Sequence, residues 1–398
     1  MASIGTLAVR PHVPPSLVYD FDIELDPTLK GHPHAGLSRL QDNAPEVFYS
    51  PRYGGNWLVR SYGLIHEIMQ DPELFASGGF EHDLIPIHAN PPEHRQYRQV
   101  MLQAFSPKRV NAMLPTVRNM AVELIDAVAS RGACEFVRDV AEPMPVIVFM
   151  RMLGLPLELM AELRRLVIKA FSASDPKVRA TVFNEQLAIF DPIIRERIDQ
   201  PQDDMLSAII AAEIDGRKPT FEEVQGYLLL LANAGLDTVV NAMSFAVWHL
   251  AENPELQTRL RQQPDLIPAA VEEFLRRYAP STISRYLTRD ACFHGVEMKA
   301  GERVVLLLPA GNLDAMVYPD PCSVVLDREM PALTFGTGIH RCLGSHLARL
   351  ELRTMIAEWL DRIPDFRLAD DIPPQAHAGM VYMVDSLHLR WTANSETL

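Results

Sequence analysis

The sequence contains few cysteines, and they do not form the patterns that disulfide frameworks or metal clusters need. Four cysteines stand at positions 134, 292, 322 and 342 of the 398 residues, far apart and without a Cys-x-x-Cys pair. A disulfide framework is not expected in a chain of this kind. An iron–sulfur cysteine cluster and the Gly-x-Gly-x-x-Gly fingerprint of dinucleotide binding are also missing, so no flavin or iron–sulfur segment is expected.

Positive charge is scarce as well. The chain has 37 Lys and Arg against 51 Asp and Glu, a net charge of −14, which argues against nucleic acid as a partner. The first twenty residues contain one Arg, several prolines and no long apolar run. This composition fits neither a signal peptide nor a membrane anchor, and it predicts a cytoplasmic protein.

The chain shows no internal repeat, low-complexity tract or linker-like segment, so residues 1–398 are interpreted as one domain. Local patterns predict a mainly helical α+β fold with small β-sheets. Helices are expected over residues 106–129, 142–153, 220–252, 264–279 and 344–362, and short strands over 55–60, 293–298, 303–308 and 380–391.

Residues 220–252 form the most apolar of these segments. The segment opens with Thr220 and Glu223 in capping-box spacing and stops before Pro254, which predicts one long helix. Its stretch 226–250 is apolar enough to cross a membrane. Polar residues interrupt that stretch, however, so a buried central helix of a globular protein is favoured and no membrane contact is expected.

Residues 335–344 carry the most specific motif. They fit the pattern Phe-x-x-Gly-x-His-x-Cys-x-Gly at every fixed position, through Phe335, Gly338, His340, Cys342 and Gly344. The expected helix that follows places the cysteine at a helix N-terminus. Backbone N–H groups and the helix dipole there favour a thiolate, which is a ligand for iron.

This motif resembles the signature of the cytochrome P450 family. The runs at 235–241, 293–296 and 362–366 are similar to the camphor-hydroxylase branch of bacterial, soluble members. The resemblance implies a haem b cofactor with Cys342 as its iron ligand. The haem would lie between the long central helix and the helix after the cysteine. The remaining three cysteines are interpreted as packing residues.

The resemblance assigns roles to further residues. Asp237 and Thr238 would be catalytic, relaying protons and hydrogen-bonding dioxygen, and Gly235 would let the helix approach the haem closely. The haem carboxylates would be bound by His94, Arg98, Arg285 and His340, and Phe335 of the Cys loop is a further expected haem contact. Glu273, Arg276 and Arg328 would form a structural clamp.

The substrate region departs from the camphor enzyme. His82 stands where that enzyme has a Tyr that donates to a ketone, and Asn233 stands at an apolar contact position. Further contacts are expected from Leu230, Ser281, Met380 and Val381. A mostly apolar lining with few polar groups suits a small hydrophobic substrate, here a cyclic terpenoid or an ionone-type (norisoprenoid) ketone.

The chain is therefore expected to be a monooxygenase that inserts one atom of O2 into a C–H bond. Because no redox domain is present, the electrons would come from a [2Fe-2S] ferredoxin with its reductase, docked at Arg95, Arg98 and Arg341. Two alternatives stay open: a peroxide-driven oxidase or dehydratase, and a non-enzymatic haem-thiolate sensor.

Overall fold

Helices make up most of the protein in the computed structural model, which describes residues 9–79, 82–102, 104–173 and 175–392. The α-helices of the first half are α1 (Pro33–Asn43), α2 (Tyr62–Gln70), α3 (His94–Leu102), α4 (Pro107–Ala112), α5 (Leu114–Ala129), α6 (Pro143–Leu153), α7 (Met160–Phe171) and α8 (Pro176–Asp199). Those of the second half are α9 (Met205–Ala211), α10 (Phe221–Gly235), α11 (Thr238–Glu252), α12 (Pro254–Gln262), α13 (Ile267–Arg277), α14 (Leu308–Gly311) and α15 (Ser345–Arg362). The helix-rich class predicted from the sequence is confirmed.

The strands form small sheets. The largest has the order β1-β2-β8-β5-β3, and the others are β4-β12-β9 and the pairs β6-β7 and β10-β11. Their bounds are β1 (Val47–Ser50), β2 (Asn56–Val59), β3 (Phe75–Ala76), β4 (Ala133–Glu135), β5 (Ile283–Leu287), β6 (Ala291–Phe293), β7 (Val296–Met298), β8 (Arg303–Leu306), β9 (Phe366–Leu368), β10 (Gln375–His377), β11 (Met383–Ser386) and β12 (His388–Trp391).

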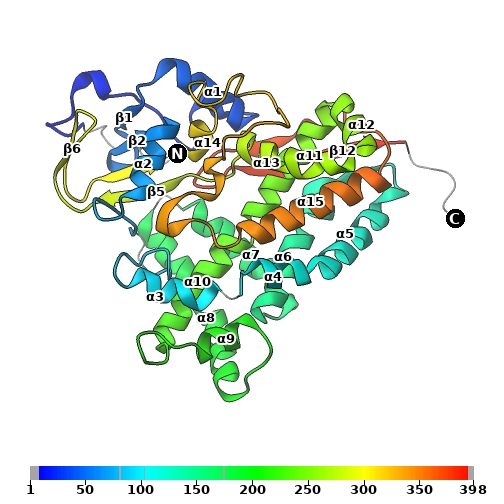
Figure 1. Cartoon of the computed structure of the whole chain (residues 1–398), viewed down its shortest axis with the longest axis horizontal. Helices are drawn as coiled ribbons and strands as arrows, with labels where there is room; N and C mark the ends of the chain where they lie inside the picture. The colour runs from blue at the N-terminus through cyan, green and yellow to red at the C-terminus, as the bar shows by residue number, and fades with distance from the viewer. Residues whose placement is uncertain (1–8, 80–81, 103, 174, 393–398) are drawn as a thin grey trace.

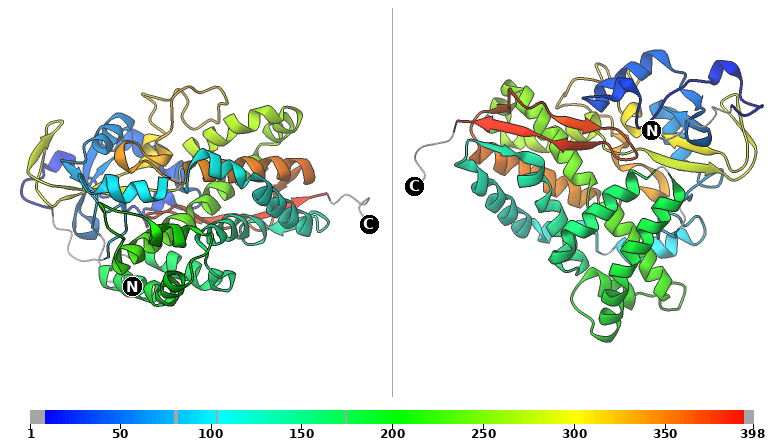
Figure 2. Two further views of the ribbon diagram at one scale, coloured as in Figure 1. Left: turned by 60° about the horizontal axis from the view of Figure 1, so that its bottom comes forward. Right: turned by 180° about the vertical axis from the view of Figure 1, so that it is seen from behind.

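The sheet-rich part and the helical part occupy different regions of the molecule. The five-stranded sheet gathers at the upper left of Figure 1 around one apolar cluster, and the helices pack around a second, larger one. Helix α15 runs beside α5 in the helical part (Figure 1). Seen from behind in Figure 2, the C-terminal strands lie across the helices.

The expected central helix is interrupted in its middle. α10 ends at Gly235 and α11 begins at Thr238, with Asp237 at φ −133° between them. The capping box at its start is present, because the Thr220 hydroxyl accepts from the N–H of Glu223 and the Glu223 carboxylate accepts from the N–H of Thr220. The segment passes the length and hydropathy test for a membrane span, but 72% of its most apolar window is buried, as expected of a core helix.

Two other expected helices and one expected strand differ from the prediction. The segment 106–129 is divided at Met113 into α4 and α5, and residues 264–266 form a 3-10 turn before α13. The expected strand over 380–391 is divided at Leu387 into β11 and β12, which pair in different sheets.

The packing role predicted for the remaining cysteines holds only for Cys134, which is buried. Cys292 and Cys322 are exposed, so that prediction is wrong for these two. Cys292 is the middle residue of β6, where side chains alternate between faces and its neighbour Phe293 takes the buried one. Cys322 lies on a loop after α14.

Candidate functional site

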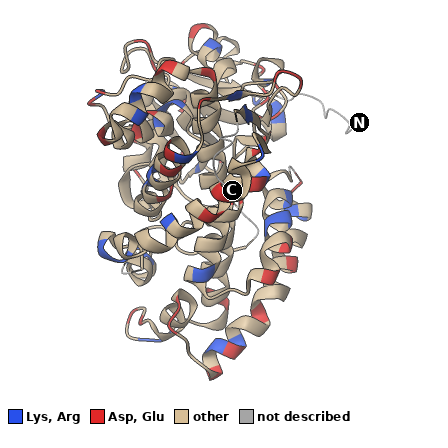
Figure 3. Ribbon diagram, turned by 90° about the vertical axis from the view of Figure 1, so that its right-hand side faces the viewer, with Lys and Arg blue, Asp and Glu red and all other residues tan. Residues whose placement is uncertain are grey.

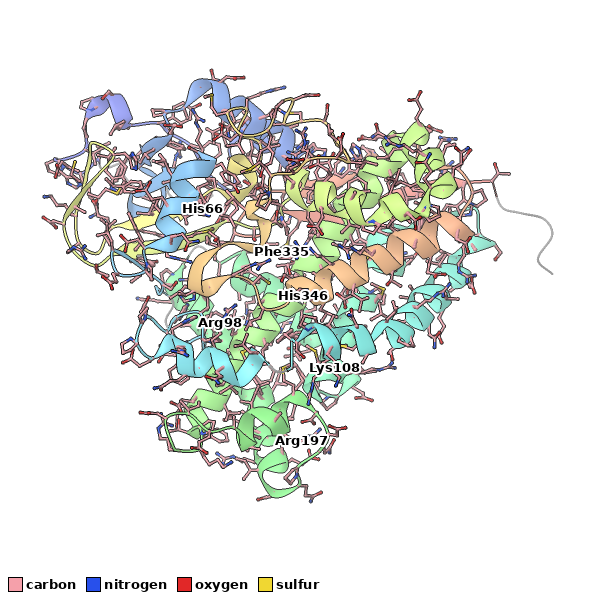
Figure 4. All side chains as sticks on the ribbon, in the orientation of Figure 1. His66, Arg98, Lys108, Arg197, Phe335 and His346 are labelled. Carbon is pink, nitrogen blue, oxygen red and sulfur yellow. The ribbon has the colours of Figure 1, made fainter. Side chains whose placement is uncertain are left out.

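A tight loop presents Cys342 just before α15. The N–H of Cys342 donates to the carbonyl of Phe335 at 2.8 Å, which closes the loop. Gly338 has φ +70°, and a Cβ on it would lie 2.3 Å from the backbone carbonyl oxygen of Met69. Only glycine meets both conditions without strain. Phe335 and His346 in Figure 4 mark the loop and the first turn of α15.

The Cys342 thiol is subject to opposing influences. Burial raises its pKa, and the backbone N–H groups of Gly344 and Ser345, together with Arg98 and Arg349, lower it. The backbone N–H groups at the start of α15 thus lower the thiol pKa, as the sequence predicts for a helix N-terminus. A cation bound beside the sulfur would lower it further.

Four basic side chains converge beside this loop: His94 and Arg98 from α3, Arg285 from β5 and His340 from the loop itself. The rings of His94 and His340 lie 4.4 Å apart, centroid to centroid. Burial, with Arg285 second, lowers the pKa of His340 to about 3, and burial, with Arg98 second, lowers that of His94. Burial also lowers the pKa of Arg285 to about 10 and lowers that of Arg98.

This cluster has hydrogen-bonding capacity but no acidic partner. The Nε2 atoms of His94 and His340 are buried without a hydrogen-bond partner. In the part of the chain that the structure describes, neither Arg98 nor Arg285 forms an ion pair with a carboxylate. Buried donors without partners are costly, and carboxylate groups of a ligand would satisfy them.

Glu273, Arg276 and Arg328 are brought together next to the Cys loop. The guanidinium of Arg276 donates two hydrogen bonds to the Glu273 carboxylate, at 2.7 and 3.0 Å, and Arg328 Nε donates a third at 3.0 Å. Arg276 also donates to the carbonyls of Asn312, Pro321 and Ser323. The three side chains thereby tie α13 to the long loop that leads to Cys342.

Asp237 and Thr238 lie at the interruption between α10 and α11. The Thr238 hydroxyl donates to the carbonyl of Ala234 at 3.2 Å. One Asp237 oxygen faces Arg164 at 3.5 Å, and Arg164 also pairs with Glu142 at 2.8 Å. The other Asp237 oxygen is buried without a partner.

Asp237 carries a pKa suited to proton exchange. Burial raises the pKa of its carboxyl to about 6, and Arg164 works against this shift. Arg164 and Glu142 are partly exposed, at 17% and 24% of their side-chain surface, so they connect the buried carboxyl to the surface. A carboxyl that gains and loses a proton near neutral pH can pass protons inward.

The structure shows a packing reason for glycine at position 235, in addition to the close approach to the haem expected from the sequence. A Cβ at this position would lie 2.5 Å from the ring of Phe149. The glycine therefore makes room for α6, which packs on this side of α10. Its neighbour Ala234 is exposed although it lies in the middle of the core segment, because it lines an internal cavity.

Two neighbouring cavities share lining residues, and one of them borders the end of α10. The inner cavity, of about 200 Å³, is lined by Leu230, Asn233, Ala234, Phe183, Arg285 and Met380, among others. The outer cavity, of about 450 Å³, shares residues with it, including Phe171, Tyr286 and Arg303, and extends to Glu24 and Tyr53.

Only part of the predicted substrate contacts lines these cavities. Leu230, Asn233 and Met380 do, and Met380 lines both. His82 does not appear in the described lining of either cavity. Its Nε2 lies 2.9 Å from Asn184 Oδ1, and its ring packs on Phe183, which does line the inner cavity. Ser281 and Val381 form a β-bridge with each other and are likewise outside the described lining.

Several residues of the site were missed in the sequence. Gln186 of α8 exchanges hydrogen bonds with Asn233, and its Oε1 accepts from Asn233 Nδ2 at 2.8 Å. Neither this pair nor the pair of Glu142 and Arg164 has a local signal, because the partners come from distant helices. Arg303 did carry a signal, since it is a charged residue at the start of an otherwise apolar predicted strand.

The residues expected to dock a redox partner lie close together. Arg95 and Arg341 are exposed, and half-buried Arg98 donates from Nη2 to the carbonyl of Arg341. Arg98 appears in Figure 4 below the Cys loop, with Lys108 on the neighbouring helix. Elsewhere, the ribbon colours of Figure 3 show basic and acidic residues along the same helices.

Comparisons with known proteins agree with this geometry. The family model described as Cytochrome P450 matches residues 162–375. The chain is 34% identical to a probable cytochrome P450 127A1 of Sinorhizobium fredii over 98% of each protein. It is also 34% identical to a steroid C26-monooxygenase of Mycolicibacterium smegmatis, over 85% of this chain and 88% of that protein.

Solved structures give the same result for the fold. The crystal structures of CYP101J2 and CYP101C1 are each 32% identical to the chain and cover 97% of it and 100% of themselves, with TM-scores of 0.87 and 0.88.

Proposed function

The chain belongs to the cytochrome P450 family and is a P450 monooxygenase, and we propose that it oxidises a small hydrophobic substrate of the cyclic terpenoid or norisoprenoid ketone type. The observation that carries this proposal is the small cavity of about 200 Å³ beside the interruption at Asp237 and Thr238. Family membership implies a haem-thiolate cofactor.

The residues present fit a haem. Cys342 would be its iron ligand, on the loop that Gly338 and the clamp around Glu273 hold in place. The unpartnered ring nitrogens of His94 and His340 and the guanidinium groups of Arg98 and Arg285 match the two carboxylates that haem b carries. When bound, a thiolate-ligated haem supplies the activation of dioxygen and the insertion of one oxygen atom into a C–H bond.

The protein's own part in this chemistry is to deliver protons and exclude water. We assign proton delivery to Asp237, whose carboxyl is buried and connected to the surface through Arg164 and Glu142. We assign the last step of this relay to the Thr238 hydroxyl, which now donates to the carbonyl of Ala234, a residue of the cavity lining. Such a relay is needed when dioxygen is the oxidant, and it favours the monooxygenase over a peroxide-driven enzyme or a sensor.

The substrate proposal rests on the size and lining of the inner cavity. A cavity of about 150 Å³ accommodates benzene, so 200 Å³ suits a ring compound somewhat larger than that. Leu230, Phe183 and Met380 supply apolar contacts, and Asn233 is the polar predicted contact that reaches the cavity. Both N–H groups of the Asn233 amide already donate, to Gln186 Oε1 and to the carbonyl of Leu229, so a ketone oxygen bound by Asn233 would take the place of one of these acceptors.

The electron donor belongs to the same proposal. Arg95, Arg98 and Arg341 form a basic group beside the Cys loop, where Arg98 donates to the carbonyl of Arg341, and this group suits an acidic [2Fe-2S] ferredoxin served by its own reductase. We also propose a cytoplasmic location, where such partners operate.

The experiment that tests the central assignment replaces Cys342. Reduced wild-type protein with carbon monoxide should show the long-wavelength band of thiolate ligation, and Cys342→Ala should lack it. Cys292→Ser, which changes an exposed cysteine on β6, serves as the control and should keep the band. Retention of the band in Cys342→Ala would contradict the assignment.

A further inference from the structure

The inner cavity contains more positive charge than a purely apolar substrate needs. Arg179, Arg285 and Arg303 all line it, whereas no Asp or Glu of the described residues does. An Arg inside a cavity is costly unless something balances its charge. The haem carboxylates proposed above would account for Arg285, because its charge acts on His340 of the Cys loop.

Arg303 points away from that carboxylate cluster. In the antiparallel pair of β5 and β8, Arg303 lies opposite Tyr286, and Arg285 lies opposite Val304. Side chains directly opposite each other share a face of the sheet, and successive residues alternate. Arg285 and Arg303 therefore project from opposite faces of this strand pair, although both line the inner cavity.

The surroundings of Arg303 leave most of its donors to the cavity. Its Nε donates to the Ser284 hydroxyl at 2.9 Å, and it forms no ion pair with any described residue. Burial lowers the pKa of Arg303, and Tyr286 and Glu24 work against this shift. Tyr286, on the same face, also lines the cavity, and its hydroxyl lies against Gly79.

The nearest carboxylates are engaged elsewhere. Glu24 and Asp175 line only the outer cavity. Asp175 accepts from the N–H of Lys177 at 2.9 Å and caps α8. Tyr53 hydrogen-bonds Glu24 and lowers its pKa, although burial raises it overall. Both are too far from Arg303 to form an ion pair, so their effect is to keep an anion in the inner cavity rather than in the outer one.

We propose that the substrate carries a carboxylate in addition to its apolar ring, and that Arg303 binds this carboxylate at the boundary between the two cavities. The inference rests on the proposed function and narrows its substrate class to cyclic terpenoid or norisoprenoid ketones that also carry a carboxylate. A guanidinium offers two parallel N–H groups that match a carboxylate. With the acid held there, the ring extends past Phe183 and Leu230 toward Ala234, next to Thr238.

The test compares ligands that differ only in charge. Perillic acid, a cyclic terpenoid acid, and its methyl ester are titrated into the haem-loaded protein, and binding is followed by the spin-state shift and by equilibrium dialysis. Wild type should bind the acid more tightly than the ester, and Arg303→Gln should weaken acid binding by about 10- to 150-fold, the range for a hydrogen bond to a charged group. Arg303→Lys should keep part of the preference, since it retains the charge but loses the fork.

Arg289→Gln is the matched control, because it removes the same charge from an exposed site two residues after β5, and it should leave acid binding unchanged. The inference is overturned if wild type binds the ester as tightly as the acid, or if Arg303→Gln keeps the preference while Arg179→Gln loses it. Either result leaves the carbon monoxide band and the oxidation of neutral ligands intact. Loss of that band in wild type would instead contradict the proposed function, whatever the acids do.

Discussion

Thr238 has a hydroxyl whose present partner is a helix carbonyl, that of Ala234 at 3.2 Å. This bond is of the ordinary back-bonding kind and is easily exchanged for another acceptor. We expect Thr238→Ala to leave haem and substrate binding intact but to divert the reducing equivalents from product into hydrogen peroxide. Thr238→Ser keeps the hydroxyl and should restore the coupling of electron use to product. Equal coupling in wild type and Thr238→Ala would remove Thr238 from the relay.

Asp237 should affect the rate rather than the coupling. Because burial raises the pKa of its carboxyl to about 6, the protonated form is accessible near neutral pH and Arg164 stabilises the ionised form. Asp237→Asn cannot exchange a proton, so turnover should fall by roughly 10²- to 10⁴-fold. The pH–rate profile of wild type should change across pH 6, and that of the variant should not. A turnover rate in Asp237→Asn close to wild type would show that protons enter by another route.

At the scale of elements, the clamp of Glu273, Arg276 and Arg328 connects α13 to the loop that leads to Cys342. Both Glu273 and Arg276 are buried. If the negative charge of Glu273 is removed, the guanidinium groups of Arg276 and Arg328 lose their anionic partner. Glu273→Gln should lower the free energy of unfolding by about 3–5 kcal/mol. Its neighbour Glu272 pairs with Arg349 at 45% side-chain exposure, and Glu272→Gln should cost about 1 kcal/mol or less. Urea denaturation of the two variants checks this, and similar losses in both would contradict a special role for the clamp.

The elements differ in how far the sequence alone predicts them. The capping box at Thr220 and the loop before α15 were predictable because their signals are local. The interruption at Leu236–Asp237 was not, because the buried Asn241 that accompanies it uses its amide to donate to the carbonyl of Asp237 and accept from the N–H of Val384. Such contacts join distant segments, and no spacing rule reports them.

The same distinction holds within the candidate site. The motif residues around Cys342 and the pair Asp237 and Thr238 were found by pattern. The substrate contact His82 was assigned by position only, and the structure places its ring behind Phe183. The roles of Arg164 and Gln186 could not be predicted, because only the packing of α7 and α8 against α10 brings Arg164 to Asp237 and Gln186 to Asn233.

At the scale of the whole molecule, a group of buried histidines connects the N-terminal region to α11 and α13. His32 and His34 of the α1 start pack against aromatic rings of α11 and the end of α13, and His249 Nδ1 lies 2.8 Å from the Tyr278 hydroxyl. Burial, with Arg277 second, lowers the pKa of His32 and of His249 to about 4, and burial lowers that of His34 further. Burial therefore opposes protonation of these three histidines in the folded protein, whereas nothing opposes it in the unfolded chain.

This arrangement predicts that the protein loses stability in mild acid. The unfolded chain binds these protons near pH 6.5, whereas the folded protein binds them near pH 4, so stability is full above pH 6.5 and falls as the pH decreases toward 4. At pH 5 each such histidine costs roughly 2 kcal/mol relative to pH 8. Urea unfolding of the haem-loaded protein at pH 8 and pH 5 measures this loss of stability. One unfolding transition at both pH values would also support the prediction that residues 1–398 form a single domain.

The variant His249→Asn retains an acceptor for Tyr278 but cannot be protonated, so its loss of stability between pH 8 and pH 5 should be smaller by roughly 2 kcal/mol. The control His294→Asn changes a histidine on the exposed hairpin and should lose as much stability as wild type. An unchanged loss in His249→Asn would mean that the acid sensitivity has its origin outside this group.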